Sequence, residues 1–205
     1  MKMIEWMRFF QAQEKEHGKR VFTVAELANA ARTPAPGLNV ELSRLLKRGL
    51  VTRYAQGRYG AIVDISPEEL LPFLDASAYI TGFYALYRQN LVMQVPVEVT
   101  CFTNRRHNRS RERLLALGKF VFVCVSPRIY DRPNEGLIAG PEQALCDFLY
   151  VTCRKSLRAE SLVTFRGLGT LSQSRLTGLL KHYPKTVKEA LHRLVTKPSS
   201  SLLPA

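Results

Sequence analysis

The sequence predicts an α+β fold in two domains, and three observations support this prediction. Residues 23–48 contain two short helical patterns separated by a proline-rich stretch. Residues 49–62 combine glycines with β-branched and aromatic residues in the pattern of a hairpin. After residue 76, apolar runs typical of strands alternate with amphipathic helical runs. We therefore expect residues 1–72 to form a winged helix-turn-helix and residues 73–197 to form a larger domain with a small sheet and surrounding helices.

The first domain is expected to begin with an amphipathic helix over residues 3–17. Ile4, Met7 and Phe10 recur at helical spacing and form its expected inner face. Trp6 is expected to join that face or to cover its edge. This helix would be the first of the winged-helix domain.

A pair of helices separated by a turn is expected next. The hydroxyl of Thr23 can cap free backbone N–H groups, and Glu26 three residues later completes a capping box. Residues 33–37 are expected to form the turn, because proline lacks an amide hydrogen and restricts its predecessor. A second helix should then span about 38–48. Its expected inner residues are Leu38, Leu42, Leu45 and Leu46.

The opposite side of that second helix has the residue types that read DNA bases. Such a helix fits the major groove, where arginine can take a guanine edge and an aliphatic side chain can meet a thymine methyl group. Taken alone, this surface fits an ordinary solvated helix equally well. The residues expected to read bases are Asn39, Val40, Ser43, Arg44 and Lys47.

A basic hairpin after this helix favours the DNA-binding interpretation. Gly49 can end the helix in a left-handed conformation, and strands over 50–54 and 58–62 are joined through Gln56 and Gly57. A wing of this kind meets phosphates, which give affinity and register but little sequence information. The alternative is a winged helix used only for protein contacts. The residues expected to contact the DNA backbone are Thr33, Arg48, Arg53, Gln56 and Arg58.

The net charge of +13 favours an acidic partner such as nucleic acid, and an anionic membrane surface less so. Residues 1–74 contribute +3 and residues 75–205 contribute +10. Residues 103–113 hold five arginines and one acid, and we expect them to form a loop or the start of a helix. This second basic patch is either a solvated loop or another contact to DNA or RNA phosphates. Its arginines are Arg105, Arg106, Arg109, Arg111 and Arg113.

The remaining elements are expected from periodicity and from turn residues. Residues 64–76 should form a connector, and residues 198–205 a disordered tail. Pro141 suits the first position of a helix. The helices are expected over 77–90, 141–153, 172–182 and 184–196, and the strands over 95–103, 120–125 and 136–139.

No motif for catalysis, a metal or a cofactor is found. The four cysteines lack paired spacing, and Cys101 and Cys124 lie in apolar runs where cysteine behaves as a small hydrophobic residue. Glu142 and Asp147 would point about 140° apart on one helix, so they do not converge, and Asp147 is expected to bond a nearby loop. We therefore expect no enzyme, no cofactor and no metal. Without a signal peptide or a membrane span, a cytoplasmic protein is expected.

The second half resembles a known family in four segments, ASAYITGFYALYRQNLVMQVP, VEVTCFTNRR, GKFVFVCVSP and GLIAGPEQALCDFLY. They are similar to the AbiEi antitoxins of type IV toxin–antitoxin systems, which act in abortive infection. The most specific piece is AGPEQALCDFL, residues 139–149, in which Gln143 stands where the family commonly has lysine. The segment RLTGLLKHYPKTVKEALHRLV is similar to the family's closing helices.

The resemblance implies a repressor that binds inverted repeats in its own promoter through the winged helix. It also implies an antitoxin domain that opposes a nucleotidyltransferase-like toxin without forming a stable complex. Two other hypotheses stay open. One is a winged-helix regulator whose second domain senses a ligand or mediates assembly. The other is a nucleic-acid-processing enzyme or accessory factor that uses the arginine-rich segment.

Overall fold

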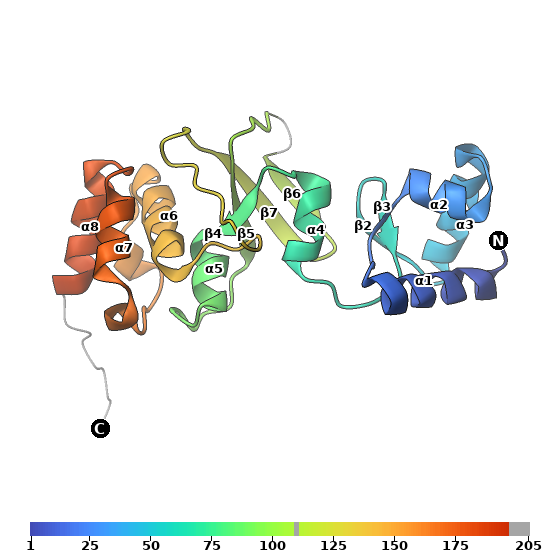
Figure 1. Cartoon of the computed structure of the whole chain (residues 1–205), viewed down its shortest axis with the longest axis horizontal. Coiled ribbons are helices and arrows are strands. Elements are labelled where there is room, and N and C mark those ends of the chain that lie inside the picture. Colours follow the sequence, from blue (N-terminus) through green and yellow to red (C-terminus); the bar gives the residue numbers. More distant parts are fainter. Residues whose placement is uncertain (109–110, 197–205) are drawn as a thin grey trace, which may run out of the picture. The chain divides into compact units, whose positions relative to one another are not determined.

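The computed structural model describes residues 1–108 and 111–196 (Figure 1). The chain divides into two compact units, Met1–Ala76 with Leu114–Gly118, and Ser77–Arg113 with Lys119–Ala205. This division falls a few residues after the expected boundary at residue 72. The fold is mixed α+β with small sheets, as predicted at that level. The expected tail, residues 198–205, lies outside the described residues.

Helix α1 (Met3–His17) forms as predicted but buries a different face. Trp6 and Phe10 are buried, whereas Ile4 and Met7 are 57% and 43% exposed. The rings of Trp6 and Phe10 stack with their centroids 5.7 Å apart. Because aromatic rings bury more apolar area than smaller side chains, the aromatic face turns inward. The predicted inner positions of Ile4 and Met7 were therefore wrong.

Helix α2 (Val24–Ala31) begins with the predicted capping box. The Thr23 hydroxyl oxygen accepts a hydrogen bond from the Glu26 N–H at 3.1 Å, and a Glu26 carboxylate oxygen accepts one from the Thr23 N–H at 2.8 Å. Two backbone donors that the helix leaves open are thereby satisfied.

Helix α3 (Ala35–Lys47) starts three residues before the predicted position, so the expected turn over 33–37 was too long. Pro34 is its N-cap and Pro36 lies in its first turn. Amide hydrogens in the first turn of a helix have no acceptor within the helix, so a proline, which lacks this hydrogen, is tolerated there. The leucines lie as predicted, with three buried and one half-buried: Leu38, Leu42, Leu45 and Leu46.

A single apolar core holds α1, α2 and α3 together. The indole Nε1 of Trp6 also donates a hydrogen bond to Glu41 Oε1 at 2.8 Å, which ties α1 to the side of α3. Burial of these side chains away from water provides most of the packing energy of such a small unit. The core residues are Trp6, Phe10, Phe22, Leu27, Leu38, Leu42, Leu45 and Val51.

A three-stranded antiparallel sheet follows the order β1-β3-β2. Strands β2 (Thr52–Ala55) and β3 (Arg58–Gly60) form the predicted hairpin around Gln56 and Gly57, and Gly57 has a φ of 67°. Strand β1 (Phe22–Thr23) was not predicted. It adds the segment before α2 to the edge of the hairpin.

Gly60 marks a close approach of two chain segments in this sheet. A Cβ atom at residue 60 would lie 2.1 Å from the carbonyl oxygen of Arg20, just before β1. No real Cβ contact is that short, so glycine is required here.

Helix α4 (Pro67–Leu74) replaces the connector expected over residues 64–76. Ser66 caps it in a second capping box, and Leu70 and Leu71 are completely buried. The two prolines of this segment suggested a linker. However, Pro67 occupies the first turn, where proline is tolerated.

A further sheet has four strands in the order β4-β5-β7-β6 (Figure 1). Strand β5 runs antiparallel to β4 and parallel to β7. The strands are β4 (Tyr79–Thr81), β5 (Glu98–Thr103), β6 (Glu112–Leu115) and β7 (Gly118–Cys124).

Three expectations for this sheet were wrong. The segment 77–90 is not one helix, because residues 79–81 form β4 and Gly82, with a φ of 63°, turns the chain into α5. Residues 136–139 form one isolated bridge between Ile80 and Ile138 in place of a full strand. Strand β6 takes the end of the arginine-rich segment, which was expected to be a loop or a helix start.

Four helices complete the second unit. Helix α6 forms as predicted, with Pro141 in its first turn, and packs against α5, α7 and α8. No helix of the described residues is long and apolar enough to cross a membrane. The four helices are α5 (Gly82–Arg88), α6 (Pro141–Arg154), α7 (Gln173–Leu180) and α8 (Lys185–Thr196).

Candidate nucleic-acid interface

The outer face of α3 carries all five residues expected to read DNA bases. They lie opposite the buried leucines, as the helical spacing predicts, and each is exposed. Val40 is 53% exposed although it is apolar. The side chains of Arg44 and Lys47 make no ion pair or hydrogen bond with other described residues, so both charges face solvent. The five residues are Asn39, Val40, Ser43, Arg44 and Lys47; the term "α3 face" is used for this set below.

Packing on the inner side holds the α3 face in place. Leu38 and Leu42 are at most 1% exposed, and Glu41 accepts the hydrogen bond from Trp6. Side chains in such close-packed surroundings have few alternative arrangements. The helix therefore presents its outer residues from a fixed support.

Two of the expected backbone-contact residues flank α3. The hydroxyl of Thr33 donates a hydrogen bond to the Ala31 carbonyl oxygen at 3.0 Å, so its proton is already used inside the turn between α2 and α3. Arg48 is exposed at the other end of the helix, with Nη1 3.9 Å from the sulfur of Met3. Apart from this weak contact, the guanidinium of Arg48 is available to a partner.

The two arginines of the hairpin, Arg53 and Arg58, lie in different environments. Arg53 and Gln56 are exposed, and the guanidinium of Arg53 makes no ion pair with the described residues. Arg58 is half-buried, with its guanidinium carbon 5.7 Å from the centre of the Phe73 ring and Nη1 bonded to the Gly57 carbonyl oxygen. Arg58 therefore packs the hairpin against α4, and less of its guanidinium is left for a phosphate.

The described arginines of the second basic patch differ in their exposure. Arg105, Arg106 and Arg111 are exposed, and Arg109 lies outside the described residues. Arg113 is half-buried, because its guanidinium carbon lies 4.7 Å from the centre of the Phe122 ring. Its Nη2 is also 3.1 Å from a ring nitrogen of His107.

Sequence reasoning missed that α6 adds an arginine to this region. Arg106 and Arg111 line a small pocket together with Arg154, which lies in the last turn of α6. No sequence signal links Arg154 to the arginine-rich segment, since more than forty residues separate them. Only the tertiary fold brings these side chains to one place.

The burial and hydrogen-bond partners of Asp147 are a second feature that could not be predicted from the sequence. Its carboxylate is completely buried and accepts hydrogen bonds from the hydroxyls of Tyr183 at 2.5 Å, Thr81 at 2.6 Å and Tyr79 at 3.2 Å. Burial raises the pKa of Asp147 to about 7, although the three hydrogen bonds favour the charged form. The carboxylate links α6 to β4 and to the short segment between α7 and α8, which contains Tyr183. It has no contact with solvent through which a substrate could reach it.

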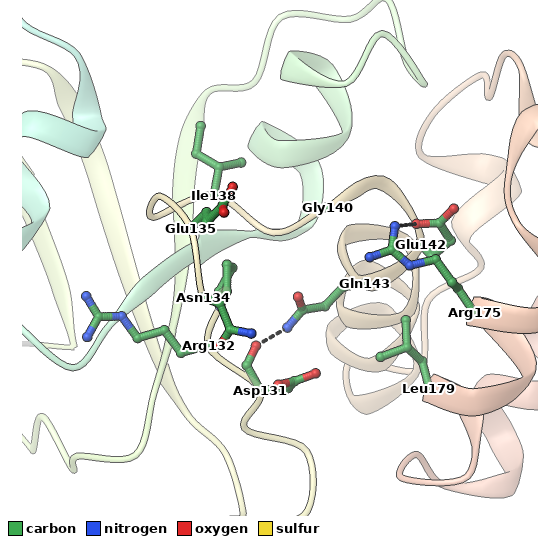
Figure 2. Close-up of a pocket in the computed structure, with 11 residues that line it drawn as sticks. Asp131, Arg132, Asn134, Glu135, Ile138, Gly140, Glu142, Gln143, Arg175 and Leu179 are labelled. Atoms are coloured by element: carbon green, nitrogen blue, oxygen red, sulfur yellow. Dashed lines mark hydrogen bonds and ion pairs between the residues drawn. The ribbon is translucent and has the colours of Figure 1, made fainter.

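A larger pocket of about 630 Å³ lies in the second unit beside α6 and α7 (Figure 2). At one side, Arg175 lies 3.8 Å from the buried carboxylate of Glu142, and Gln143 donates a hydrogen bond to the carbonyl oxygen of Asp131. Arg132 points away from Arg175 (Figure 2). Because acids and arginines alternate around this pocket, its lining does not favour one kind of ligand.

The cysteines and acidic residues do not assemble into a metal centre. In residues 1–108 and 111–196, no group of three or more His, Cys, Asp or Glu side chains is placed to hold a metal ion. Cys101 is buried in β5 as expected, whereas Cys124 at the end of β7 is exposed, so its expected place in the core was wrong. Comparison with protein-family models and with curated proteins finds no match for the chain.

Proposed function

We propose that this protein is a sequence-specific DNA-binding transcriptional repressor whose first unit is a winged helix-turn-helix. In this proposal α2 and α3 are the helix pair, and the β2–β3 hairpin is the wing. The observation that carries the proposal is the α3 face, on which two unpaired cations surround an exposed valine.

The chemistry of the α3 face suits the major groove. Arg44 can form paired hydrogen bonds with a guanine edge, and Asn39 can do the same with an adenine. An aliphatic side chain such as Val40 can contact a thymine methyl group. Arg48 and Arg53 would then neutralise phosphates beside the groove and hold the helix in register.

The resemblance to AbiEi antitoxins supports a more specific proposal. We propose that the protein represses its own operon by binding inverted repeats in its promoter. We also propose that the second unit opposes a nucleotidyltransferase-like toxin without forming a stable complex with it. No residue of the second unit is assigned to that activity, because the residues that resemble the family pack or cap α6.

Binding to the protein's own upstream DNA tests the repressor proposal. The intact protein is titrated against that DNA and a scrambled control over a series of salt concentrations. Arg44→Ala should weaken binding to the upstream DNA by about tenfold to a hundredfold, since one paired base contact contributes about 1–3 kcal/mol. Arg8→Ala is the matched control, because Arg8 is an exposed arginine on α1 outside the α3 face.

The scrambled DNA separates base reading from general attraction. We expect Arg44→Ala to change binding to the scrambled DNA about as little as Arg8→Ala does. Equal binding of the wild-type protein to both DNAs, with a steep loss as salt rises, would overturn the proposal. In that case the net charge of +13 alone would account for binding.

The antitoxin proposal is tested by co-expression. A nucleotidyltransferase-like toxin encoded beside this gene should stop growth alone and should not do so when this protein is present. Arg44→Ala should still protect, because the activity is assigned to the second unit. If protection requires Arg44, repression of the toxin gene explains it and the proposed antitoxin role is wrong.

A further inference from the structure

Three arginines from two distant segments of the sequence line one small pocket of the second unit. Arg106 and Arg111 lie between β5 and β6, and Arg154 ends α6. The pocket has a volume of about 200 Å³. Its other lining residues are His107, Asn108, Phe122, Val123 and Cys124.

Among the described residues, no acidic side chain lines this pocket. The guanidinium groups of Arg106, Arg111 and Arg154 make no ion pair or hydrogen bond with the described residues. Glu112 follows Arg111 in the sequence, but its carboxylate is paired with Lys119 at 2.8 Å. Like charges gathered in one pocket repel each other, so an anion bound among them would be stabilised.

Aromatic contacts support the walls of the pocket. Phe122 is buried, and the ring of His107 lies 4.7 Å from the Phe122 ring, centre to centre. The guanidinium carbon of Arg154 lies 5.5 Å from the centre of the Tyr150 ring on the same helix. These contacts restrict the side chains that face the pocket.

Charge and shape together select the ligand. Guanidinium groups match phosphate oxygens in paired hydrogen bonds. A phosphate within a nucleic-acid backbone has one negative charge, whereas a phosphate monoester has about −1.5 to −2 at neutral pH. Three arginines around one small pocket match the monoester better than the backbone diester.

We propose that this pocket binds a phosphate monoester, either at the end of a nucleic-acid strand or on a free nucleotide. The site goes beyond the proposed repressor function and does not depend on it, because every lining residue belongs to the second unit. The pocket thereby assigns a shared role to Arg106, Arg111 and Arg154.

Calorimetric titration of the intact protein tests this site. The probes are inorganic phosphate, adenosine monophosphate and adenosine, followed by a short single-stranded oligonucleotide with and without a 5′-phosphate. We expect adenosine monophosphate to bind and adenosine not to bind. The phosphorylated oligonucleotide should bind about tenfold or more tightly than the unphosphorylated one, as expected for charged hydrogen bonds.

Two arginine variants locate the binding. Arg154→Gln should weaken binding of adenosine monophosphate by about tenfold or more. Arg158→Gln removes an equal charge from an exposed residue outside the pocket lining and should leave binding unchanged. Both residues are exposed, and matching circular dichroism spectra would show that the variants fold.

The relative affinities identify the source of the phosphate. Tighter binding of the phosphorylated oligonucleotide supports a strand end as the ligand, and tighter binding of the nucleotide supports a small molecule. Failure of both phosphate and adenosine monophosphate to bind overturns the proposal. Equal binding of the two oligonucleotides, with equal loss in Arg154→Gln and Arg158→Gln, also overturns it and indicates general electrostatic attraction.

Discussion

Replacement of Asp147 by asparagine is expected to change how the stability of the second unit depends on pH. Asp147 is completely buried, and burial raises its pKa from 3.8 to about 7. Between these two values the folded protein holds a proton that the unfolded chain has released. Rising pH therefore favours the unfolded chain throughout this window.

The expected loss of stability follows from the difference between the pKa of Asp147 in the unfolded chain and its pKa in the folded protein. The stabilising contribution is fully present below the unfolded pKa of 3.8 and is lost as the pH rises through the folded pKa of about 7. Each pH unit within the window lowers the free energy of unfolding by about 1.4 kcal/mol. Between about pH 5 and pH 8 the loss from this one group should be about 3 kcal/mol.

Urea unfolding at several pH values measures this dependence. Asp147→Asn retains the size of the side chain and one acceptor oxygen, replaces the other oxygen with an NH2 donor, and does not titrate. Glu135→Gln is the matched control, since Glu135 is exposed. Six of the eight tyrosines belong to the second unit, including Tyr79 and Tyr183 beside Asp147, so the near-ultraviolet circular dichroism of tyrosine reports mainly on that unit.

We expect the wild type and Glu135→Gln to lose stability together as the pH rises, and Asp147→Asn to lose about 3 kcal/mol less between pH 5 and pH 8. Titration of other groups is common to all three proteins and cancels in the comparison. An equally steep loss in Asp147→Asn would refute the reasoning. The carboxylate would then be charged in the folded protein across this range.

Three further predictions concern the first unit. Leu42→Ala should lower the free energy of unfolding of the first unit by about 2–5 kcal/mol, because the Leu42 side chain is only 1% exposed. The fluorescence of Trp6 during urea unfolding measures this loss. A loss below about 1 kcal/mol would contradict the packing described for Leu42. In the same assay, Thr23→Ala should lower the free energy of unfolding by about 1 kcal/mol, and Thr23→Ser, which keeps the capping hydroxyl, should lower it by less. Equal losses in the two variants would show that the hydroxyl does not cap α2. Gly60→Ala should prevent normal folding of the unit, because its Cβ would lie 2.1 Å from a carbonyl oxygen. Gly18→Ala, where no atom lies within 4 Å, should cost only about 1 kcal/mol of backbone strain, and comparable loss in both variants would contradict the steric argument.

Local patterns allowed much of the first unit to be predicted. The capping box at Thr23 and the two-residue turn at Gly57 each depend on residues within a few positions of one another. The α3 face follows from the angle between successive residues of one helix, so its inner and outer sides could be assigned without the tertiary structure. The start of α3 was misplaced because proline breaks a helix interior but suits a first turn.

Features that depend on distant residues could not be predicted. Strand β1 has two residues, too few to show alternation, and it exists only because β3 lies beside it. Strand β4 was read as helix because a continuous apolar run fits either element. The partners of Asp147 and the pocket at Arg154 join segments from separate helices and strands, and no spacing within the sequence encodes such contacts.

The pairing of β1 with β3 has a consequence for how the first unit could adapt to a partner. Strand β1 pairs with Arg58 and Tyr59 of the hairpin, and the missing Cβ of Gly60 lets the backbone of Arg20 lie close beside β3. A hairpin tied in this way cannot swing independently of the helix that follows β1. Because α2 packs against α3, the spacing between the outer residues of α3 and Arg53 is restricted as well, and we expect a binding site of different spacing to deform when it is accommodated. Selectivity among sites could thus come from the stiffness of the partner as well as from its chemical groups.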